Sequence, residues 1–208
     1  IYMQLMLEKA EDAGKMITQS MLRRHGEASE LFPGLEDGSW FNRINSFAEE
    51  HGLELEHYII SSGIWEMLLG SRIAKYFKHI WASKFAYQGD VAHWPSAAIN
   101  YTTKTQFLFR INKGIINSWD NEALNTYTPP HLRPVPFERM VFFGDGDTDV
   151  PTMKMLTYQG GSSIAVYEDA ARSRRKVHSL ISNGRVEFTA KADYTENSQI
   201  DITAKGII

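Results

Sequence analysis

Apolar residues recur along the chain at two spacings, and each spacing predicts a different kind of element. Where they return every three or four positions, they predict amphipathic helices. One or two such helices cover residues 2–25, and the methionines on their apolar side favour core packing over the lining of a substrate lid. Further helices are predicted to begin at Ser39, Trp65, Lys104, Pro151 and Asp169, and another lies near Ile200.

Short, continuous apolar runs predict strands that are buried on both faces. These runs occupy residues 56–60, 79–82, 140–143, 163–166 and 186–188. Because they alternate with helices, we expect an α/β protein with a three-layer, Rossmann-like parallel sheet. Residues 83–101 show little periodicity and are predicted to be an irregular, partly packed segment, whereas the proline-rich residues 117–136 are predicted to be a loop.

The composition fits one compact domain, or a core domain with a small accessory piece. Of the 208 residues, 43% are hydrophobic and 23% are charged, and the net charge of −3 favours neither nucleic acid nor anionic membranes as partners. The absence of cysteine excludes disulfides and thiolate metal sites. No apolar run approaches the about 20 residues that cross a bilayer, and no signal pattern opens the chain. We therefore expect a cytoplasmic protein, with its oligomeric state left open.

The strongest chemical signal is the acidic turn at residues 144–149, Gly-Asp-Gly-Asp-Thr-Asp, which directly follows an apolar run. Its three carboxylates repel one another unless a cation lies among them. Mg²⁺ suits such a turn, because it takes one or two carboxylates together with waters and phosphate oxygens. An EF-hand calcium loop is disfavoured, since Val150 and Leu156 stand where that loop has Gly and Glu. The plainer alternative is a solvated acidic turn without a ligand.

Two weaker signals precede the acidic turn. Ser61, Ser62 and Gly63 stand between a predicted strand and a predicted helix, where a hydroxyl and backbone N–H groups can bind an anion. Lys104 opens a predicted helix, where a cation opposes the helix dipole unless an anion lies nearby. Taken singly, each signal has a plainer explanation, since serines cap helices and most lysines lie on the surface.

In order and spacing, residues 59–63, Lys104 and residues 144–149 resemble the second, third and fourth motifs of the haloacid dehalogenase-like (HAD) phosphohydrolase superfamily. The chain is similar to capped members such as the phosphoserine phosphatase-like enzymes. This resemblance implies a HAD-like α/β core over residues 31–208 and a remnant of a small helical cap over residues 1–30.

The resemblance also implies a role for each matching residue. Asp145 would bind Mg²⁺ directly, and Asp149 would bind it directly or through water. Ser61 and its neighbours Ser62 and Gly63 would bind the phosphoryl group, and Lys104 would neutralise charge on the phosphate and on the nucleophile. Lys104, Asp145 and Asp149 are thus the predicted catalytic residues, in keeping with the positioning and charge stabilisation that phosphoryl transfer needs.

The first motif of the superfamily, a strand ending in the Asp-x-Asp that supplies the nucleophile, is absent from this sequence. None of Asp12, Asp37 and Asp90 follows an apolar run or has an aspartate two positions later. By resemblance, the missing strand lies in the middle of the sheet. We therefore expect a nucleophile-bearing segment upstream of Ile1, and little or no turnover by the chain as printed.

The function that these signals predict is Mg²⁺-dependent hydrolysis of a small phosphorylated metabolite through an aspartyl-phosphate intermediate, that is, a HAD-type phosphatase. The alternative is a catalytically inactive HAD-like protein that binds a phosphorylated ligand or a partner. Phosphotransfer stays open within the same fold. Dehalogenation is disfavoured, because an acidic turn that binds a cation serves phosphate rather than a carbon–halogen bond.

Overall fold

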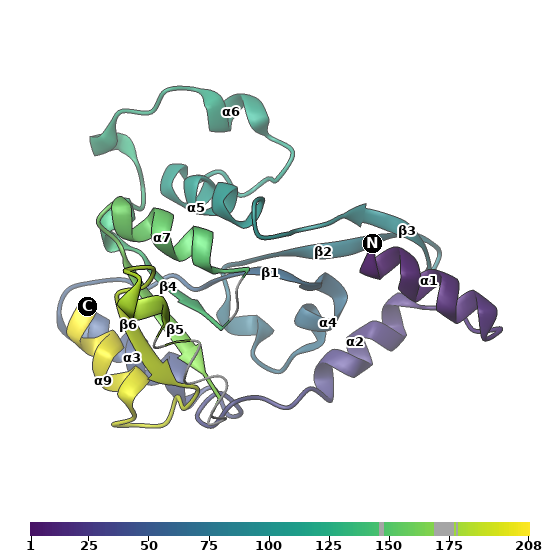
Figure 1. Cartoon of the computed structure of the whole chain (residues 1–208), viewed down its shortest axis with the longest axis horizontal. Helices are drawn as coiled ribbons and strands as arrows, with labels where there is room; N and C mark the ends of the chain where they lie inside the picture. The colour runs from purple at the N-terminus through teal and green to yellow at the C-terminus, as the bar shows by residue number, and fades with distance from the viewer. Residues whose placement is uncertain (146–147, 169–176, 178) are drawn as a thin grey trace. The chain divides into compact units, whose positions relative to one another are not determined.

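The computed structural model of the chain describes residues 1–145, 148–168, 177 and 179–208. These residues form two compact units, and each unit has its own three-stranded sheet (Figure 1). The first unit comprises Ile1–Leu31, Glu36–Gly38 and Glu56–Asn100, and the second comprises Phe32–Leu35, Ser39–Leu55 and Tyr101–Ile208. Both units combine helices with parallel strand pairs, although β2 and β3 of the first unit pair antiparallel, so the predicted α/β class is confirmed.

The second unit is built on a parallel sheet. Strands β4 (Val141–Gly144), β5 (Ser162–Tyr167) and β6 (Phe188–Lys191) pair in that order. Parallel neighbours need a crossover connection, and helix α7 (Val150–Tyr158) provides the one between β4 and β5. The strands predicted at 140–143 and 163–166 are thereby confirmed, and the last strand begins two residues later than predicted.

Two consecutive residues of β4 show that helices cover both faces of this sheet, because side chains alternate along a strand. Phe142 packs against the buried cluster that includes Met153 of α7. The ring of Phe143 instead meets Trp40 of α3 (Ser39–Glu50) edge to face, with the centroids 6.4 Å apart. Helix α5 (Lys104–Lys113) packs beside α7, and α9 (Gln199–Ile207) packs beside α3 and β6. The three-layer, Rossmann-like arrangement is therefore present in this unit.

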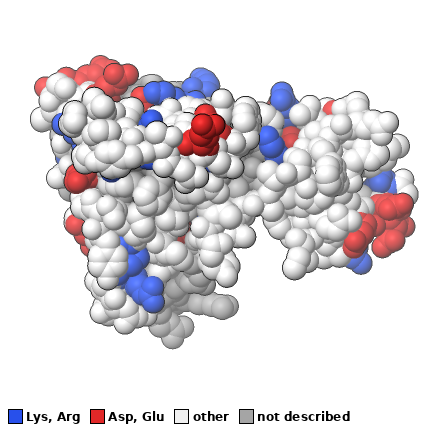
Figure 2. All heavy atoms as spheres, turned by 90° about the horizontal axis from the view of Figure 1, so that it is seen from above, with Lys and Arg blue, Asp and Glu red and all other residues white. Residues whose placement is uncertain are grey.

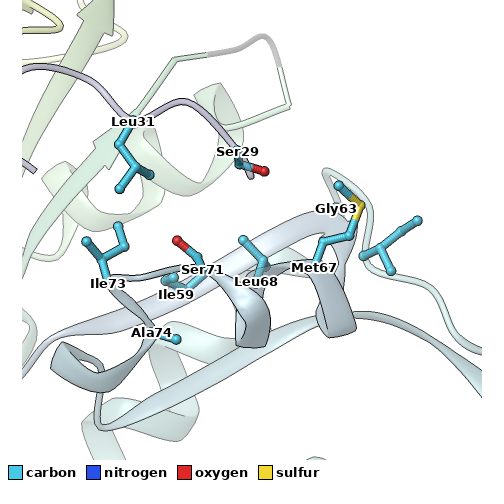
Figure 3. Close-up of a pocket in the computed structure, with 10 residues that line it drawn as sticks. Ser29, Leu31, Ile59, Gly63, Met67, Leu68, Ser71, Ile73 and Ala74 are labelled. Carbon is cyan, nitrogen blue, oxygen red and sulfur yellow. The ribbon is translucent and has the colours of Figure 1, made fainter. Parts of the chain in front are cut away.

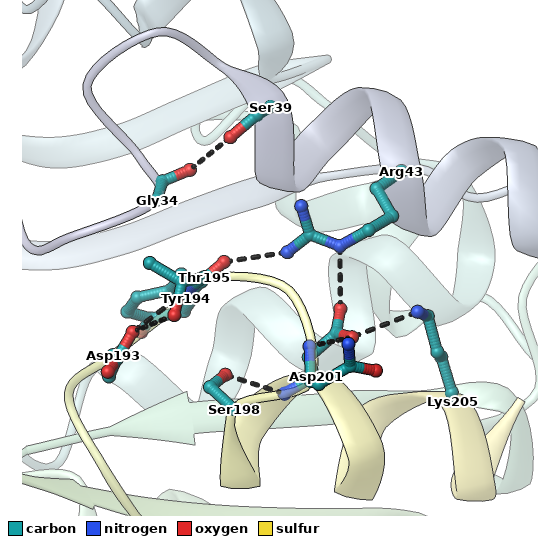
Figure 4. A network of polar contacts seen from close by, with 10 residues as sticks. Gly34, Ser39, Arg43, Asp193, Tyr194, Thr195, Ser198, Asp201 and Lys205 are labelled. Atoms are coloured by element: carbon teal, nitrogen blue, oxygen red, sulfur yellow. Dashed lines mark hydrogen bonds and ion pairs between the residues drawn. The ribbon is translucent and has the colours of Figure 1, made fainter.

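A buried carboxylate joins α3 to α9 in the second unit (Figure 4). Asp201 is 0% exposed and accepts hydrogen bonds from Arg43 Nε and Lys205 Nζ, both at 2.9 Å. It also accepts the backbone N–H of Asn197 at 3.0 Å. The second guanidinium nitrogen of Arg43 donates to the carbonyl of Tyr194 at 2.7 Å, so the loop before α9 is fixed to the same helix.

The first unit contains a mixed sheet of β1 (Tyr58–Ile64), β2 (His79–Gln88) and β3 (Val91–Ala97). Strand β1 runs parallel to β2, and β3 returns antiparallel after a turn at Gly89, whose φ is +59°. The prediction of an irregular segment at residues 83–101 is therefore wrong. No alternation of apolar and polar residues marks β3 in the sequence, because this strand buries only Ala92. It also carries Pro95 at a register shift, where proline is tolerated in an edge strand.

Two helices at the N-terminus of the first unit pack on this sheet, as predicted for residues 2–25. They are α1 (Tyr2–Asp12) and α2 (Gln19–Glu27), and α2 packs closely on α4 (Trp65–Gly70). The close approach requires glycine on both helices. A Cβ at Gly26 would lie 1.9 Å from the carbonyl oxygen of Met67, and one at Gly70 would lie 2.0 Å from that of Arg23.

Several short helices complete the chain. The predicted loop at 117–136 contains α6 (Asn121–Asn125) and a 3₁₀ turn at Pro130–Leu132, and further 3₁₀ turns lie at Ala74–Tyr76 and Phe137–Arg139. The helix predicted to begin at Asp169 falls largely outside the described residues.

The division between the compact units differs from the domain boundary predicted at residue 30. Residues 56–100 belong to the same unit as residues 1–31, whereas the expectation grouped them with residues 101–208. The assignment of residues 1–30 to a cap and of residues 31–208 to a HAD-like core stays a prediction.

Over the described ranges, no helix combines the length and the apolar character that crossing a bilayer requires. In Figure 2, basic and acidic side chains are scattered in small groups over a largely uncharged face, which fits the small net charge.

Candidate functional site

The lysine at the start of α5 and the last aspartate of the acidic turn form a buried ion pair in the second unit. Lys104 is the first residue of α5, and Asp149 is the N-cap residue of α7. Lys104 Nζ lies 2.5 Å from Asp149 Oδ1, and the two residues are 5% and 4% exposed. A surface lysine, the plainer explanation of Lys104, is therefore wrong. The carboxylate supplies the anion that a lysine in the first turn of a helix needs.

Gly144 makes room for this pair at the end of β4. A Cβ at this position would lie 2.7 Å from the Cβ of Asp149 and 2.4 Å from the Cε of Met153. The requirement is one of space, since real Cβ atoms do not approach neighbours so closely. The first glycine of the acidic turn thus lets Asp149 lie directly against the strand end.

Asp145 follows β4 directly and is exposed, and it borders a small cavity of about 130 Å³. The cavity is lined by residues that include Glu168 and Ala192, which follow the ends of β5 and β6. Burial, together with the negative charge of Asp145, raises the pKa of nearby Tyr194 to about 12. The carboxyl ends of the three parallel strands thus meet at one cavity, as expected for this class of sheet.

Glu168 is a carboxylate of this cavity that the sequence analysis did not single out. It stands directly after β5, just as Asp145 stands directly after β4. The available signal was its position, two residues beyond an apolar run that was predicted to be a strand. Because Glu168 belongs to none of the motifs described above, that position alone carried little weight.

The described carboxylates suit Mg²⁺ by their chemistry. Asp145 and Asp149 offer oxygen donors, and Mg²⁺ is held by one or two carboxylates with waters completing its coordination. Gly146 and Asp147 lie outside the described residues. Within the part of the chain that the structure describes, no three His, Asp or Glu side chains are grouped so as to hold a metal ion. Two carboxylates of the acidic turn are therefore the candidate ligands.

Residues 61–63 belong to the first unit, and their local structure differs from the prediction. Ser61, Ser62 and Gly63 lie inside β1, which continues to Ile64, rather than between a strand and a helix. The N-cap of α4 is Ile64, which makes no side-chain capping bond. The serines therefore lie within β1, and helix capping does not account for them.

A larger cavity of about 290 Å³ lies within the first unit (Figure 3). Its walls come from β1, from α4 and the turn after it, and from the segment that follows α2. Gly63 reaches its edge, and the other lining residues are mostly apolar: Leu31, Ile59, Ile64, Met67, Leu68, Ile73 and Ala74, with Ser29 and Ser71. This lining suits an apolar group rather than a phosphate.

The predicted site residues thus divide between the two units. Lys104 and Asp149 are in contact, and Asp145 lies one residue beyond Gly144, against which Asp149 packs. Residues 61–63 belong to the first unit. The convergence of all of them on one phosphate stays a prediction.

No family model matches the chain. An uncharacterized protein of Borreliella burgdorferi is 28% identical over 177 residues, which cover 76% of this chain and 59% of that protein. The chain therefore spans less than two thirds of the length of this relative.

Among solved structures, the crystal structure of cytosolic 5'-nucleotidase IIIB bound to cytidine is similar over 95% of this chain and 64% of that chain. The sequence identity is 14%, and the TM-score is 0.46. A TM-score of this size does not establish a shared fold. Membership of the HAD superfamily accordingly stays a prediction that follows from the motifs.

Proposed function

We propose that the protein is a Mg²⁺-dependent phosphomonoester hydrolase of the HAD type that acts on a small phosphorylated metabolite. The observation that carries this proposal is the buried Lys104–Asp149 pair at the starts of two helices, beside strand β4, which ends directly before Asp145. Buried charges are retained where they are paired or where they bind a ligand, and this pair combines a cation suited to phosphate with a carboxylate suited to a metal.

Each residue has a defined task in the proposed reaction. The ammonium group of Lys104 would neutralise part of the negative charge on the phosphate and on the attacking group. Asp145 and Asp149 would hold Mg²⁺, which supplies further neutralisation of the phosphate oxygens when bound. The Ser61 hydroxyl would donate to a phosphoryl oxygen, with the backbone of Ser62 and Gly63 beside it. Positioning and charge stabilisation of this kind account for most of the catalysis of phosphoryl transfer.

The nucleophile is proposed to be an aspartate on a strand upstream of Ile1. Its carboxylate would attack phosphorus to form an aspartyl-phosphate, while the second aspartate of the Asp-x-Asp gives its proton to the leaving alcohol oxygen. The same aspartate would then take a proton from the water that hydrolyses the acyl phosphate. The described sheets leave room for an added strand. In the described sheets, β4 pairs with β5 alone and β1 pairs with β2 alone. Each therefore has an edge at which another strand could form backbone hydrogen bonds.

Release of phosphate from a broad panel of phosphomonoesters, with and without Mg²⁺, tests the proposal. We expect Mg²⁺-stimulated turnover by a natural form that carries an upstream Asp-x-Asp strand, and little or none by the chain as printed. Asp145→Asn should abolish that turnover while the circular dichroism spectrum stays unchanged. Asp12→Asn makes the same chemical change at an exposed position near the end of α1 and should have no effect. A complete protein without Mg²⁺-stimulated release would defeat the proposal.

The alternative is a catalytically inactive HAD-like protein that binds a phosphorylated ligand or a partner. The absence of an Asp-x-Asp strand from this sequence favours it. It predicts binding of phosphate without turnover in every natural form of the protein. The amino-acid sequence upstream of Ile1 separates the two functions, because an apolar strand ending in Asp-x-Asp is required by the hydrolase alone.

A further inference from the structure

Residues 61–63 leave the ladder of hydrogen bonds between β1 and β2. Ile60 stands opposite Trp81, and Ile64 stands opposite Ser83, with an irregularity between them. Four steps along β1 thus match two steps along β2, so β1 carries extra residues at this point. We call residues 61–63 the serine bulge. Bulges re-aim side chains and are frequent beside active sites.

Two hydroxyl groups from outside the bulge hold its backbone. The carbonyl oxygen of Ser62 accepts a hydrogen bond from the hydroxyl of Tyr2 at 2.7 Å and another from Ser83 Oγ at 3.2 Å. Ser83 is 0% exposed, and its Oγ also accepts the backbone N–H of Ile99 at 3.0 Å. Because that N–H occupies an acceptor position of the Ser83 hydroxyl, its proton is directed to the carbonyl of Ser62.

The proton of Tyr2 is retained at neutral pH. Burial, opposed by the contact with Ser83 and reinforced by the negative charge of Glu66, raises the pKa of Tyr2 above its ordinary value. Tyr2 therefore acts as a hydrogen-bond donor under physiological conditions.

A planar peptide connects these two donors to Ser61. The carbonyl of Ser62 and the N–H of Gly63 belong to the same peptide unit, so a donor that fixes the carbonyl also fixes the direction of the N–H. That N–H donates to Ser61 Oγ at 3.0 Å. A Cβ at Gly63 would lie 3.1 Å from Ser61 Oγ, so glycine gives the hydroxyl room to lie this close. With an acceptor position of Oγ engaged by the Gly63 N–H, the proton of Ser61 remains to be donated elsewhere.

We infer that Tyr2 and Ser83 are positioning residues for Ser61: by orienting the Ser62–Gly63 peptide, they aim the Ser61 hydroxyl as a donor to a phosphoryl oxygen. The inference rests on the proposed function, in which Ser61 binds the phosphoryl group. Tyr2 comes from α1 and Ser83 from β2, so the aim of the hydroxyl depends on the packing of α1 on the sheet.

Nuclear magnetic resonance of the ¹⁵N-labelled full chain tests this inference. The amide resonance of Gly63 reports the N–H that reaches Ser61, and titration with inorganic phosphate in the presence of Mg²⁺ reports binding. Tyr2→Phe removes one donor with little change in volume at a residue that is 45% exposed, and Ser83→Ala removes the other. Ser96→Ala is the matched control, because Ser96 Oγ likewise donates to a backbone carbonyl in the same sheet, that of Lys84.

We expect Tyr2→Phe and Ser83→Ala each to move the Gly63 resonance without phosphate and to weaken phosphate binding about fivefold, the effect of one lost neutral hydrogen bond. In the double variant, phosphate binding should weaken by less than the product of the two single fold-changes, because both donors act on one carbonyl. Ser96→Ala should change neither quantity.

Two results separate the inference from the proposed function. If Tyr2→Phe and Ser83→Ala leave both the Gly63 resonance and the phosphate affinity at their wild-type values, the inference is overturned. If the wild-type spectrum does not respond to phosphate at all, the proposed role of Ser61 fails. The Gly63 shifts of the phosphate-free variants then still decide whether the two hydroxyls orient the peptide.

Discussion

The two compact units hold their candidate functional groups by different physical means. In the second unit, charged side chains are buried against opposite charges in the Lys104–Asp149 pair and in the cluster around Asp201. In the first unit, the serine bulge is held by neutral hydroxyl groups, and the ion pair between Lys78 and Glu56 is partly exposed. The difference indicates where a substitution will unfold the protein and where it will only redirect a side chain.

The largest effect is expected at the buried pair. Lys104→Met removes the cation and leaves Asp149 buried without it, which should lower the free energy of unfolding by about 3–5 kcal/mol. Adding Asp149→Asn should recover part of this loss, because the buried negative charge that Lys104 neutralised is removed. Urea unfolding of the two variants measures both quantities. A loss below about 1 kcal/mol for Lys104→Met would mean that the pair is held no differently from a surface pair.

The next largest effect is expected at Asp201, where the stability should depend on pH. Although burial alone would raise the pKa of Asp201, its hydrogen bonds with Lys205 and Arg43 dominate, and the pKa is lowered from its ordinary 3.8. A carboxyl group whose pKa is lower in the folded state stabilises the protein above pH 3.8, and this contribution is lost as the pH falls through the folded-state value.

Asp201→Asn should therefore lower the free energy of unfolding by about 3 kcal/mol at pH 7, because Arg43 loses its buried partner. At a pH well below 3.8, the variant and the wild type should differ much less. Chemical unfolding at the two pH values tests this expectation. An equal difference at both would show that the carboxylate charge is not what stabilises the α3–α9 contact.

A side chain larger than glycine at position 144 should lower the free energy of unfolding less than Asp201→Asn does. It should, however, disturb the candidate site directly. Gly144→Ala places a methyl group against Asp149 and Met153, at a cost of about 1–3 kcal/mol. It should also reduce Mg²⁺-stimulated turnover of the natural protein, because Asp149 must move. Gly206→Ala, in the open at the end of α9, is the control and should be neutral or stabilising. Similar unfolding midpoints for the two variants would contradict the close packing at Gly144.

The smallest effect is expected at the ion pair of the first unit. Lys78 and Glu56 have side chains that are 53% and 28% exposed, so Lys78→Ala should lower the free energy of unfolding by no more than about 1 kcal/mol. Raising the salt concentration should reduce this difference further. A loss as large as that of Lys104→Met would erase the contrast between the two units.

Local pattern predicted much of the second unit. Pro151 in the first turn of one helix and Lys104 at the start of another were both placed correctly. The apolar run before the acidic turn is strand β4. These features depend on spacing and turn chemistry within a few residues, which the sequence carries directly.

The first unit was predicted less well, and its particular residues show why. Strand β3 exposes most of its side chains and includes a proline, so neither alternation nor composition marks it as a strand. The serine bulge resembles the end of a strand in sequence, yet β1 continues through it, because Ile64 pairs again with β2. An irregularity of this kind depends on the partner strand, and no local pattern specifies it.

The sequence by itself determined which functional groups the chain carries and their local setting: an acidic turn after a buried strand, a lysine that opens a helix, and a pair of serines near another strand. The tertiary structure alone decided which of these groups meet. It pairs Lys104 with Asp149 across 45 positions and joins Tyr2 to Ser62 across 60. The physical reason is that contacts over such separations are set by how helices and strands pack, whereas periodicity and turn residues act only on their neighbours in the chain.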